Sequence, residues 1–102
     1  MPDNLEWLEE WYQRQCDGAW EHDQGIRLES LRQRGWRLTI SLLGTSAENV
    51  PPKRLNLDTS GEEWIDCSIT GQRFEGAGDP RRLEQIIGVF RKWVEEPRQT
   101  QS

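Results

Sequence analysis

The chain of 102 residues has little of several residue types that mark common classes of protein. It has one histidine, one methionine and two cysteines. Two cysteines are too few for a disulfide framework in a chain of this size, so we expect reduced thiols and a cytoplasmic location. No apolar run approaches the roughly 18 residues that a membrane span needs, and the acidic N-terminus does not resemble a signal peptide. A membrane is therefore not an expected partner.

The chain also has no surplus of basic over acidic residues. Lysine and arginine number 13 against 18 aspartate and glutamate residues, which gives a net charge of −5. Nucleic acids and anionic lipid surfaces would repel such a chain, so neither is expected to bind it.

The length and the aromatic content predict a single folded domain. Six tryptophans supply much of the apolar surface that the chain can bury. We place the domain at residues 1–96 and predict that the polar stretch after Pro97, residues 97–102, is a disordered tail.

Helical periodicity occurs near both ends of the chain. The first predicted helix has Asp3 as its N-cap and ends near Cys16, with Gly18 behind it. The second is predicted to have Asp79 as its N-cap and Pro80 as its first helical residue, and to end before Pro97. Its apolar stripe consists of Leu83, Ile86, Ile87, Phe90, Trp93 and Val94.

Between the helices the apolar residues alternate with a period of two, which predicts β-strands. Strands are expected around 26–29, 36–42, 55–57 and 65–69, with a possible short fifth at 73–75. The prediction is a two-layer α+β domain, α-β-β-β-β-α, with an antiparallel meander of four to five strands and both helices on one face. Trp36 is predicted to lie in the core. The outer face of the sheet would carry Arg27, Glu29, Arg37, Thr39, Arg54, Asn56, Asp58, Trp64 and Asp66.

No metal site or cofactor site is expected from the pattern of possible ligands. Cys16 and His22 have five residues between them, and no second histidine completes a zinc ligand set. Cys67 falls at an apolar position in the middle of a predicted strand, where a buried thiol is the ordinary interpretation. The glycine-containing loop of residues 74–80 lacks the lysine and spacing of a phosphate-binding loop and is interpreted as a flexible entry to the second helix.

An enzyme remains an alternative at this stage. Cys16 and His22 could form a thiolate–imidazolium pair, as a small cysteine-dependent, sulfurtransferase-like enzyme would require. However, Cys16 stands at the end of a helix, where the helix dipole disfavours a thiolate. A module that binds a metabolite in an apolar pocket is a further alternative.

The stretch CDGAWEHDQG, residues 16–25, concentrates polar chemistry and has two interpretations. In the first, Asp17 and Gly18 end the helix and Trp20 folds under the edge of the sheet. In the second, the stretch is a contact loop for another protein. Composition alone does not decide between them.

Three segments together resemble the immunity protein 53 family of small bacterial proteins. They are LEWLEEWYQRQCDGAWEHDQGIRLESL, then GWRLTISLLGTSAEN, then EWIDCSITGQRFEGAGDP followed by an amphipathic helix. The resemblance covers Leu5 to about Val94. It implies a non-enzymatic, cytoplasmic protein of α+β fold that neutralises a cognate toxin by direct, stoichiometric binding.

On this basis we predict where the toxin binds. The acidic charge would steer a basic, nuclease-like toxin. Trp20 would be the anchor of the contact, and Glu75 would join it from the loop before the second helix. The full set of predicted contact residues is Asp17, Trp20, Glu21, His22, Asp23 and Glu75. The alternative contact surface is the open face of the sheet, at Asp58, Trp64 and Asp66.

Overall fold

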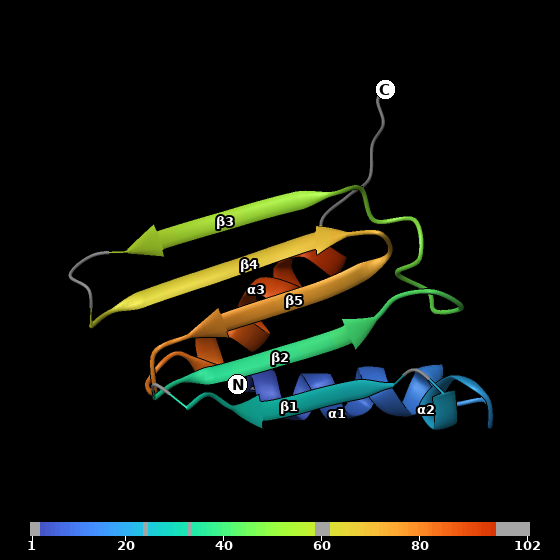
Figure 1. The fold of residues 1–102 in the computed structure, drawn as a ribbon. Helices are drawn as coiled ribbons and strands as arrows, with labels where there is room; N and C mark the ends of the chain where they lie inside the picture. The colour runs from blue at the N-terminus through green and yellow to red at the C-terminus, as the bar shows by residue number, and fades with distance from the viewer. Residues whose placement is uncertain (1–2, 24, 33, 59–61, 96–102) are drawn as a thin grey trace.

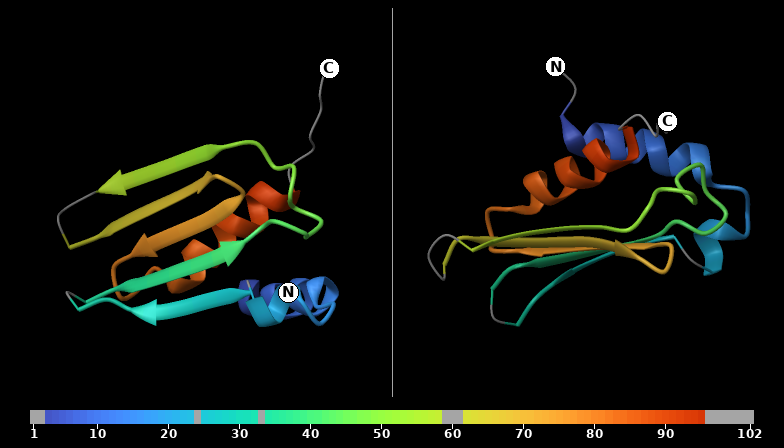
Figure 2. Two further views of the ribbon diagram at one scale, coloured as in Figure 1. Left: turned by 45° about the vertical axis from the view of Figure 1, so that its right-hand side comes forward. Right: turned by 90° about the horizontal axis from the view of Figure 1, so that it is seen from above.

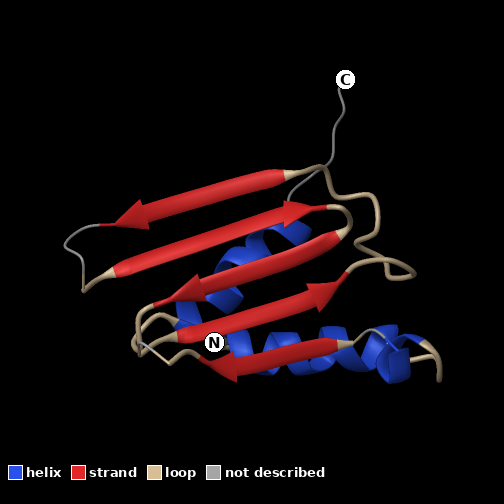
Figure 3. Ribbon diagram, viewed as in Figure 1, coloured by secondary structure: helices blue, strands red, loops and turns tan. Residues whose placement is uncertain are grey.

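The computed structural model describes residues 3–23, 25–32, 34–58 and 62–95, apart from the side chain of Asp23. Within these ranges there are three helices and five strands (Figures 1 and 3). The helices are α1 (Asn4–Gln15), the single-turn α2 (Trp20–Asp23) and α3 (Leu83–Glu95). The strands are β1 (Ile26–Ser30), β2 (Trp36–Ser41), β3 (Lys53–Asp58), β4 (Trp64–Thr70) and β5 (Arg73–Gly78). The predicted α+β class is confirmed, including the fifth strand. The predicted tail at 97–102 lies outside the described residues.

The five strands form one antiparallel sheet in the order β1-β2-β5-β4-β3. The prediction of antiparallel pairing is confirmed, but the prediction of a meander is wrong, because β2 and β3 are not neighbours. Strand β3 lies at the far edge of the sheet, and β4 and β5 lie between it and β2 (Figure 1). Strands β3, β4 and β5 follow one another as paired neighbours, and β2, which a long connection joins to β3, lies beside β5. This is a Greek-key arrangement.

The connection between β2 and β3, residues 42–52, explains this order. The backbone N–H of Leu42 donates to the carbonyl of Gln72 at 2.9 Å, so the chain continues beside β5 where a hairpin would turn back. Ala47 and Val50 are buried further along, and they fix the connection to the end of the core. The segment therefore carries the chain past β5 and β4 to the opposite edge.

Both long helices cover one face of the sheet, and the other face is open, as predicted (Figure 2). The core between the layers is built on aromatic rings. The ring centroids of Trp7 and Trp11 in α1 lie 5.9 and 5.1 Å from that of Phe90 in α3. Phe74 of β5 lies 4.9 Å from Phe90. The predicted core role of Phe90 is thus confirmed.

Trp36 departs from its predicted place in the core. It lies on the helix-facing side of β2 but is the first residue of the strand, where it is only partly buried. Its indole Nε1 donates to the carbonyl of Pro80 at 3.0 Å. Trp36 therefore closes the margin of the core.

The two predicted helix starts have different outcomes. Asp3 caps α1, since its Oδ1 accepts from the backbone N–H of Glu6 at 2.7 Å. Helix α3 begins at Leu83, four residues after Asp79, so the prediction that Asp79 and Pro80 begin this helix is wrong. The carboxylate of Asp79 is turned instead to the start of β4, where it accepts from the backbone N–H of Trp64 at 2.8 Å.

Candidate functional site

The carboxylates of the predicted contact loop bind the backbone of the loop itself. Oδ1 of Asp17 accepts from the N–H groups of Ala19 and Trp20, at 3.0 and 2.9 Å. The two oxygens of Glu21 accept from the N–H groups of Asp17 and Gly18, at 2.9 and 2.8 Å. Hydrogen bonds from Trp20 and Ala19 lower the pKa of Asp17 below its ordinary value. These two acids therefore fold the turn that joins α1 to α2.

Trp20 is part of the core. It exposes 4% of its surface, and its indole Nε1 donates to the carbonyl of Ser41 at 3.1 Å. Its ring packs edge-on against Trp11, with centroids 5.8 Å apart, and against Tyr12 at 5.6 Å. The role of Trp20 as an exposed anchor is contradicted by this burial. The other interpretation, in which Trp20 folds under the edge of the sheet, is confirmed.

The remaining members of the predicted contact set do not gather around Trp20. Glu75 lies on β5, on the face of the sheet that the helices leave open. The start of α3 lies near the beginning of α1 and not near its end, because Oε2 of Glu84 accepts from the backbone N–H of Asn4 at 3.1 Å. His22 is exposed on α2, and the side chain of Asp23 lies outside the described part of the chain.

The two thiols have separate environments. The Sγ of Cys16 donates to the carbonyl of Tyr12, one turn back on α1, at 3.2 Å. Cys67 is fully buried in β4, and burial, helped by the charge of Asp66, raises the pKa of its thiol to about 12. Both thiols are free, as predicted. Within the described ranges, no three His, Cys, Asp or Glu side chains lie together in a group that could hold a metal ion.

The face of the sheet opposite the two long helices is uncovered (Figure 2). We call it the outer face. Because side chains alternate along each strand, arginines and carboxylates from all five strands reach this face. They are Arg27, Arg37, Arg54 and Arg73, and Glu29, Asp58, Asp66 and Glu75.

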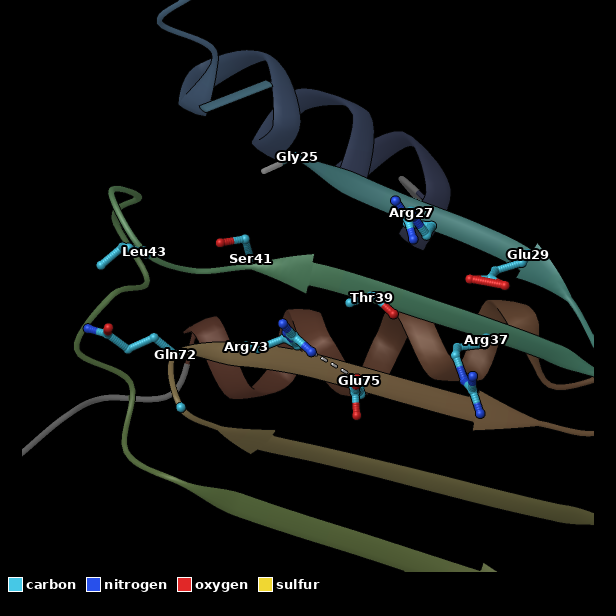
Figure 4. Close-up of a pocket in the computed structure, with 11 residues that line it drawn as sticks. Gly25, Arg27, Glu29, Arg37, Thr39, Ser41, Leu43, Gln72, Arg73 and Glu75 are labelled. Carbon is cyan, nitrogen blue, oxygen red and sulfur yellow. Dashed lines mark ion pairs between the residues drawn. The ribbon is translucent and has the colours of Figure 1, made fainter. Parts of the chain in front are cut away.

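One half of the outer face is hollowed over β1, β2 and β5. The hollow has a volume of about 460 Å³ (Figure 4). Arg27, Thr39 and Glu75 lie opposite one another on the three strands, as the register shows. Arg73 and Glu75 form an ion pair at 3.5 Å. The hollow is lined by Gly25, Arg27, Glu29, Arg37, Thr39, Ser41, Leu43, Gly71, Gln72, Arg73 and Glu75.

The other half of the outer face contains the predicted alternative surface. Asp58 of β3 and Trp64 of β4 are directly paired, and Asp66 follows on the same face. Asp66 forms an ion pair with Arg54 at 3.4 Å. Trp64 is half-buried, which leaves part of its ring accessible. The structure thus brings together all three residues of the alternative surface, Asp58, Trp64 and Asp66.

Asp79 fixes the position of Trp64, and sequence reasoning missed this role. Asp79 is 3% exposed, and its two oxygens accept from the N–H groups of Trp64 and Arg81 and from Nε of Arg82. Burial acts to raise the pKa of Asp79, but these donors outweigh it and lower the pKa below its ordinary value. The sequence signal was ambiguous, because an aspartate before a proline is also typical of a helix N-cap.

The negative charge is unevenly distributed over the two layers. Residues 3–23, which form α1 and α2, hold seven carboxylates and one arginine. The rest of the chain is close to neutral, and the outer face carries arginines and carboxylates in equal number. The acidic surplus therefore lies on the helix side of the molecule, away from the outer face.

Comparison with known proteins gives one family. The family described as Immunity protein 53 has a model that matches residues 5–95, which is most of the chain. No curated protein and no solved structure matches the chain. In the described part of the chain, no helix has the length and apolar character to cross a membrane.

Proposed function

Because the chain belongs to the immunity protein 53 family, we propose that it protects its producer by binding a cognate toxin directly, one molecule to one, without catalysis. The family match over residues 5–95 is the observation that carries this proposal. We place the encounter in the cytoplasm.

We further propose that the toxin binds to the outer face. A sheet with one face covered by helices and the other bare offers a broad, rigid surface for a partner. Trp64 would be the anchor, because half-buried tryptophans at rigid positions often dominate the energy of interfaces. Asp58, Asp66 and Glu75 would pair with basic groups of the toxin, and the neighbouring arginines with its acids.

The acidic helix side and the mixed-charge outer face would contribute to binding in different ways. The net charge of −5 attracts a basic, nuclease-like toxin over a distance. The outer face, with both signs of charge, then selects for a complementary mixed pattern at short range. Steering affects the association rate, whereas docking on the outer face determines how long the complex lasts.

Co-expression with the product of the adjacent toxin gene tests this function. We expect the two proteins to co-purify and the cells to grow. The double variant Trp64→Ala, Asp66→Lys should lose both properties while remaining folded. Glu10→Lys, on the exposed side of α1, is the matched control and should retain both. Failure of the wild-type protein to co-purify and to protect would refute the immunity function. Loss with Glu10→Lys but not with the double variant would move the interface to the helix side.

The alternative of a cysteine-dependent enzyme has weaker support. The Cys16 thiol donates a hydrogen bond to the backbone carbonyl of Tyr12, one turn back on α1. A toxin binder needs neither thiol, so Cys16→Ser should leave protection intact, whereas an enzyme that uses Cys16 would lose its activity.

A metabolite-binding module would need an enclosed apolar pocket with a few converging polar groups. The hollow of the outer face is lined mainly by charged and polar side chains, including Arg27, Arg37 and Glu75. This lining suits a protein surface better than a small apolar ligand.

A further inference from the structure

The sheet has two edge strands, β1 and β3, and they differ in their protection against pairing with another strand. Strand β3 follows Pro51 and Pro52 and begins with Lys53, which lies opposite Ile69 and so on the helix-facing side. Prolines and inward-facing lysines are common devices that prevent edge pairing. Strand β1, with the sequence IRLES, contains neither device. The β1 edge is therefore the one open to a further strand.

The hydrogen bonds between β1 and β2 show which backbone groups of β1 are available. Gly25 accepts from the N–H of Ser41 at 3.2 Å, and Leu31 donates to Gly35 at 2.8 Å. In an antiparallel pair the bonded residues alternate, so the odd-numbered residues of β1 are bonded to β2. The N–H and C=O groups of Ile26, Leu28 and Ser30 therefore point away from the sheet.

Four of the five side chains of β1 are also exposed, those of residues 27–30. Leu28 lies on the helix-facing side, opposite Leu38, and yet exposes 50% of its surface. Arg27 and Glu29 lie on the outer face, and neither has a hydrogen-bond or ion-pair partner among the described residues. An apolar residue between two opposite charges is thus presented beside a row of free backbone groups.

We propose that two copies of the chain pair through β1, antiparallel and about a twofold axis at Leu28. The residues whose backbone groups point away from the sheet then pair across the axis: Ile26 faces Ser30 of the second copy, and Leu28 faces Leu28. Arg27 faces Glu29 of the second copy on the outer face, and the reverse pair follows by symmetry. These charged pairs fall at positions without backbone hydrogen bonds, where opposite side chains are closest.

The charges select this register against its neighbours. The free backbone groups allow shifts of two residues only, because a shift of one residue would place bonded groups at the edge. A shift in one direction brings Arg27 opposite Arg27, and a shift in the other brings Glu29 opposite Glu29. Like charges directly opposite are destabilising, so only the register about Leu28 pairs every charge with its opposite.

The resulting assembly is a continuous ten-stranded sheet with the outer faces of both copies on one side. A seam of five residues from each copy is smaller than the roughly 800 Å² per partner that a standard interface buries. The dimer is therefore weak, with a dissociation constant in about the micromolar to 100 micromolar range.

Sedimentation equilibrium of the purified chain from about 10 to 500 μM tests the pairing. We expect a monomer–dimer equilibrium. Arg27→Glu should weaken the dimer at least about tenfold, because it places like charges across the seam twice. Glu29→Arg should do the same, and the double variant Arg27→Glu, Glu29→Arg should restore the dimer. Arg54→Glu, on the other edge strand β3, is the matched control and should leave the dissociation constant of the dimer unchanged.

Hydrogen exchange supplies a second readout. The amides of Ile26, Leu28 and Ser30 should exchange more slowly as the concentration rises. A chain that is monomeric at 500 μM would overturn the proposal. So would a dimer that Arg54→Glu disrupts and Arg27→Glu does not, or a folded double variant that stays monomeric.

Discussion

The carboxylate of Asp79 and the backbone N–H of Trp64 are joined by a hydrogen bond of 2.8 Å. The backbone completes the pair in the other direction, since the N–H of Asp79 donates to the carbonyl of Trp64 at 3.1 Å. A buried acid thus holds the first residue of β4, whose side chain lies on the outer face. Asp79, on the connection between β5 and α3, therefore fixes the backbone position of Trp64, the residue that we propose as the anchor.

Replacement of Asp79 should therefore change stability and its dependence on pH. The folded-state pKa of Asp79 is lowered, so its contribution is present above the unfolded-state pKa of about 3.9 and is lost as pH falls through the folded-state pKa. Asp79→Asn should be less stable than the wild type at pH 7. Its stability should also fall less between about pH 4 and pH 2. Urea denaturation at a series of pH values measures both effects.

The exposed Glu62, in the turn before β4, supplies the control for this experiment. Glu62→Gln should keep the wild-type urea midpoint at pH 7. If the free energy of unfolding of Asp79→Asn and that of the wild type change in parallel from pH 7 to pH 2, the ionised carboxylate of Asp79 does not stabilise the fold.

Trp20 should contribute to stability as a core residue does. Trp20→Ala removes a ring buried against Trp11 and leaves a cavity, which should reduce the free energy of unfolding by about 3–5 kcal/mol. Leu5→Ala, at a site with 52% exposure on α1, should change it by less than about 1 kcal/mol. Chemical denaturation followed by far-UV circular dichroism compares the two. Equal small losses would place Trp20 at the surface, where the sequence interpretation of a contact anchor had it.

The contact between β5 and α3 leaves no room at Gly76. A Cβ at this position would lie 2.5 Å from Cγ2 of Ile86. Gly76→Ala should therefore destabilise the domain by about 1–3 kcal/mol through overpacking. Ile86→Ala removes Cγ2, so combining it with Gly76→Ala should cost less than the sum of the losses caused by the two single changes. If the two changes are simply additive in a double-mutant cycle, the close approach is not the cause.

The two thiols should react at very different rates. A thiol with a pKa of about 12 carries almost no thiolate at pH 8, and Cys67 is also inaccessible. With a thiol reagent such as Ellman's, the native chain should show one reactive group, Cys16, and the unfolded chain two. Cys16→Ser should show none in the native state. Modification of Cys67 in the native chain at its unfolded rate would contradict its burial.

The sequence predicted the local elements because their signals are local. The period of two located the strands, and Asp3 marked the start of α1. The strand order depends on contacts that periodicity does not carry: Leu42 bonds to Gln72, thirty positions along the chain. A run of turn residues at 44–52 gave no sign that Ala47 and Val50 pack into the core.

The candidate site shows the same division. Asp17 and Glu21 were predicted to belong to one contact loop, but nothing in the sequence showed that both carboxylates bind the backbone of their own turn. The sequence left open whether Trp20 is a contact anchor or folds under the edge of the sheet, because its burial involves a distant partner, the carbonyl of Ser41. The alternation along β3 and β4 did place Trp64 on the outer face, because that inference needs only the strand period.

Calorimetric titration of the purified toxin into the chain and its variants tests the proposed interface most directly. We expect one toxin bound per chain, with Trp64→Ala raising the dissociation constant about thirtyfold or more and Glu10→Lys leaving it within about threefold. A folded Trp64→Ala variant with wild-type affinity, together with a large loss for Glu10→Lys, would contradict binding through the outer face.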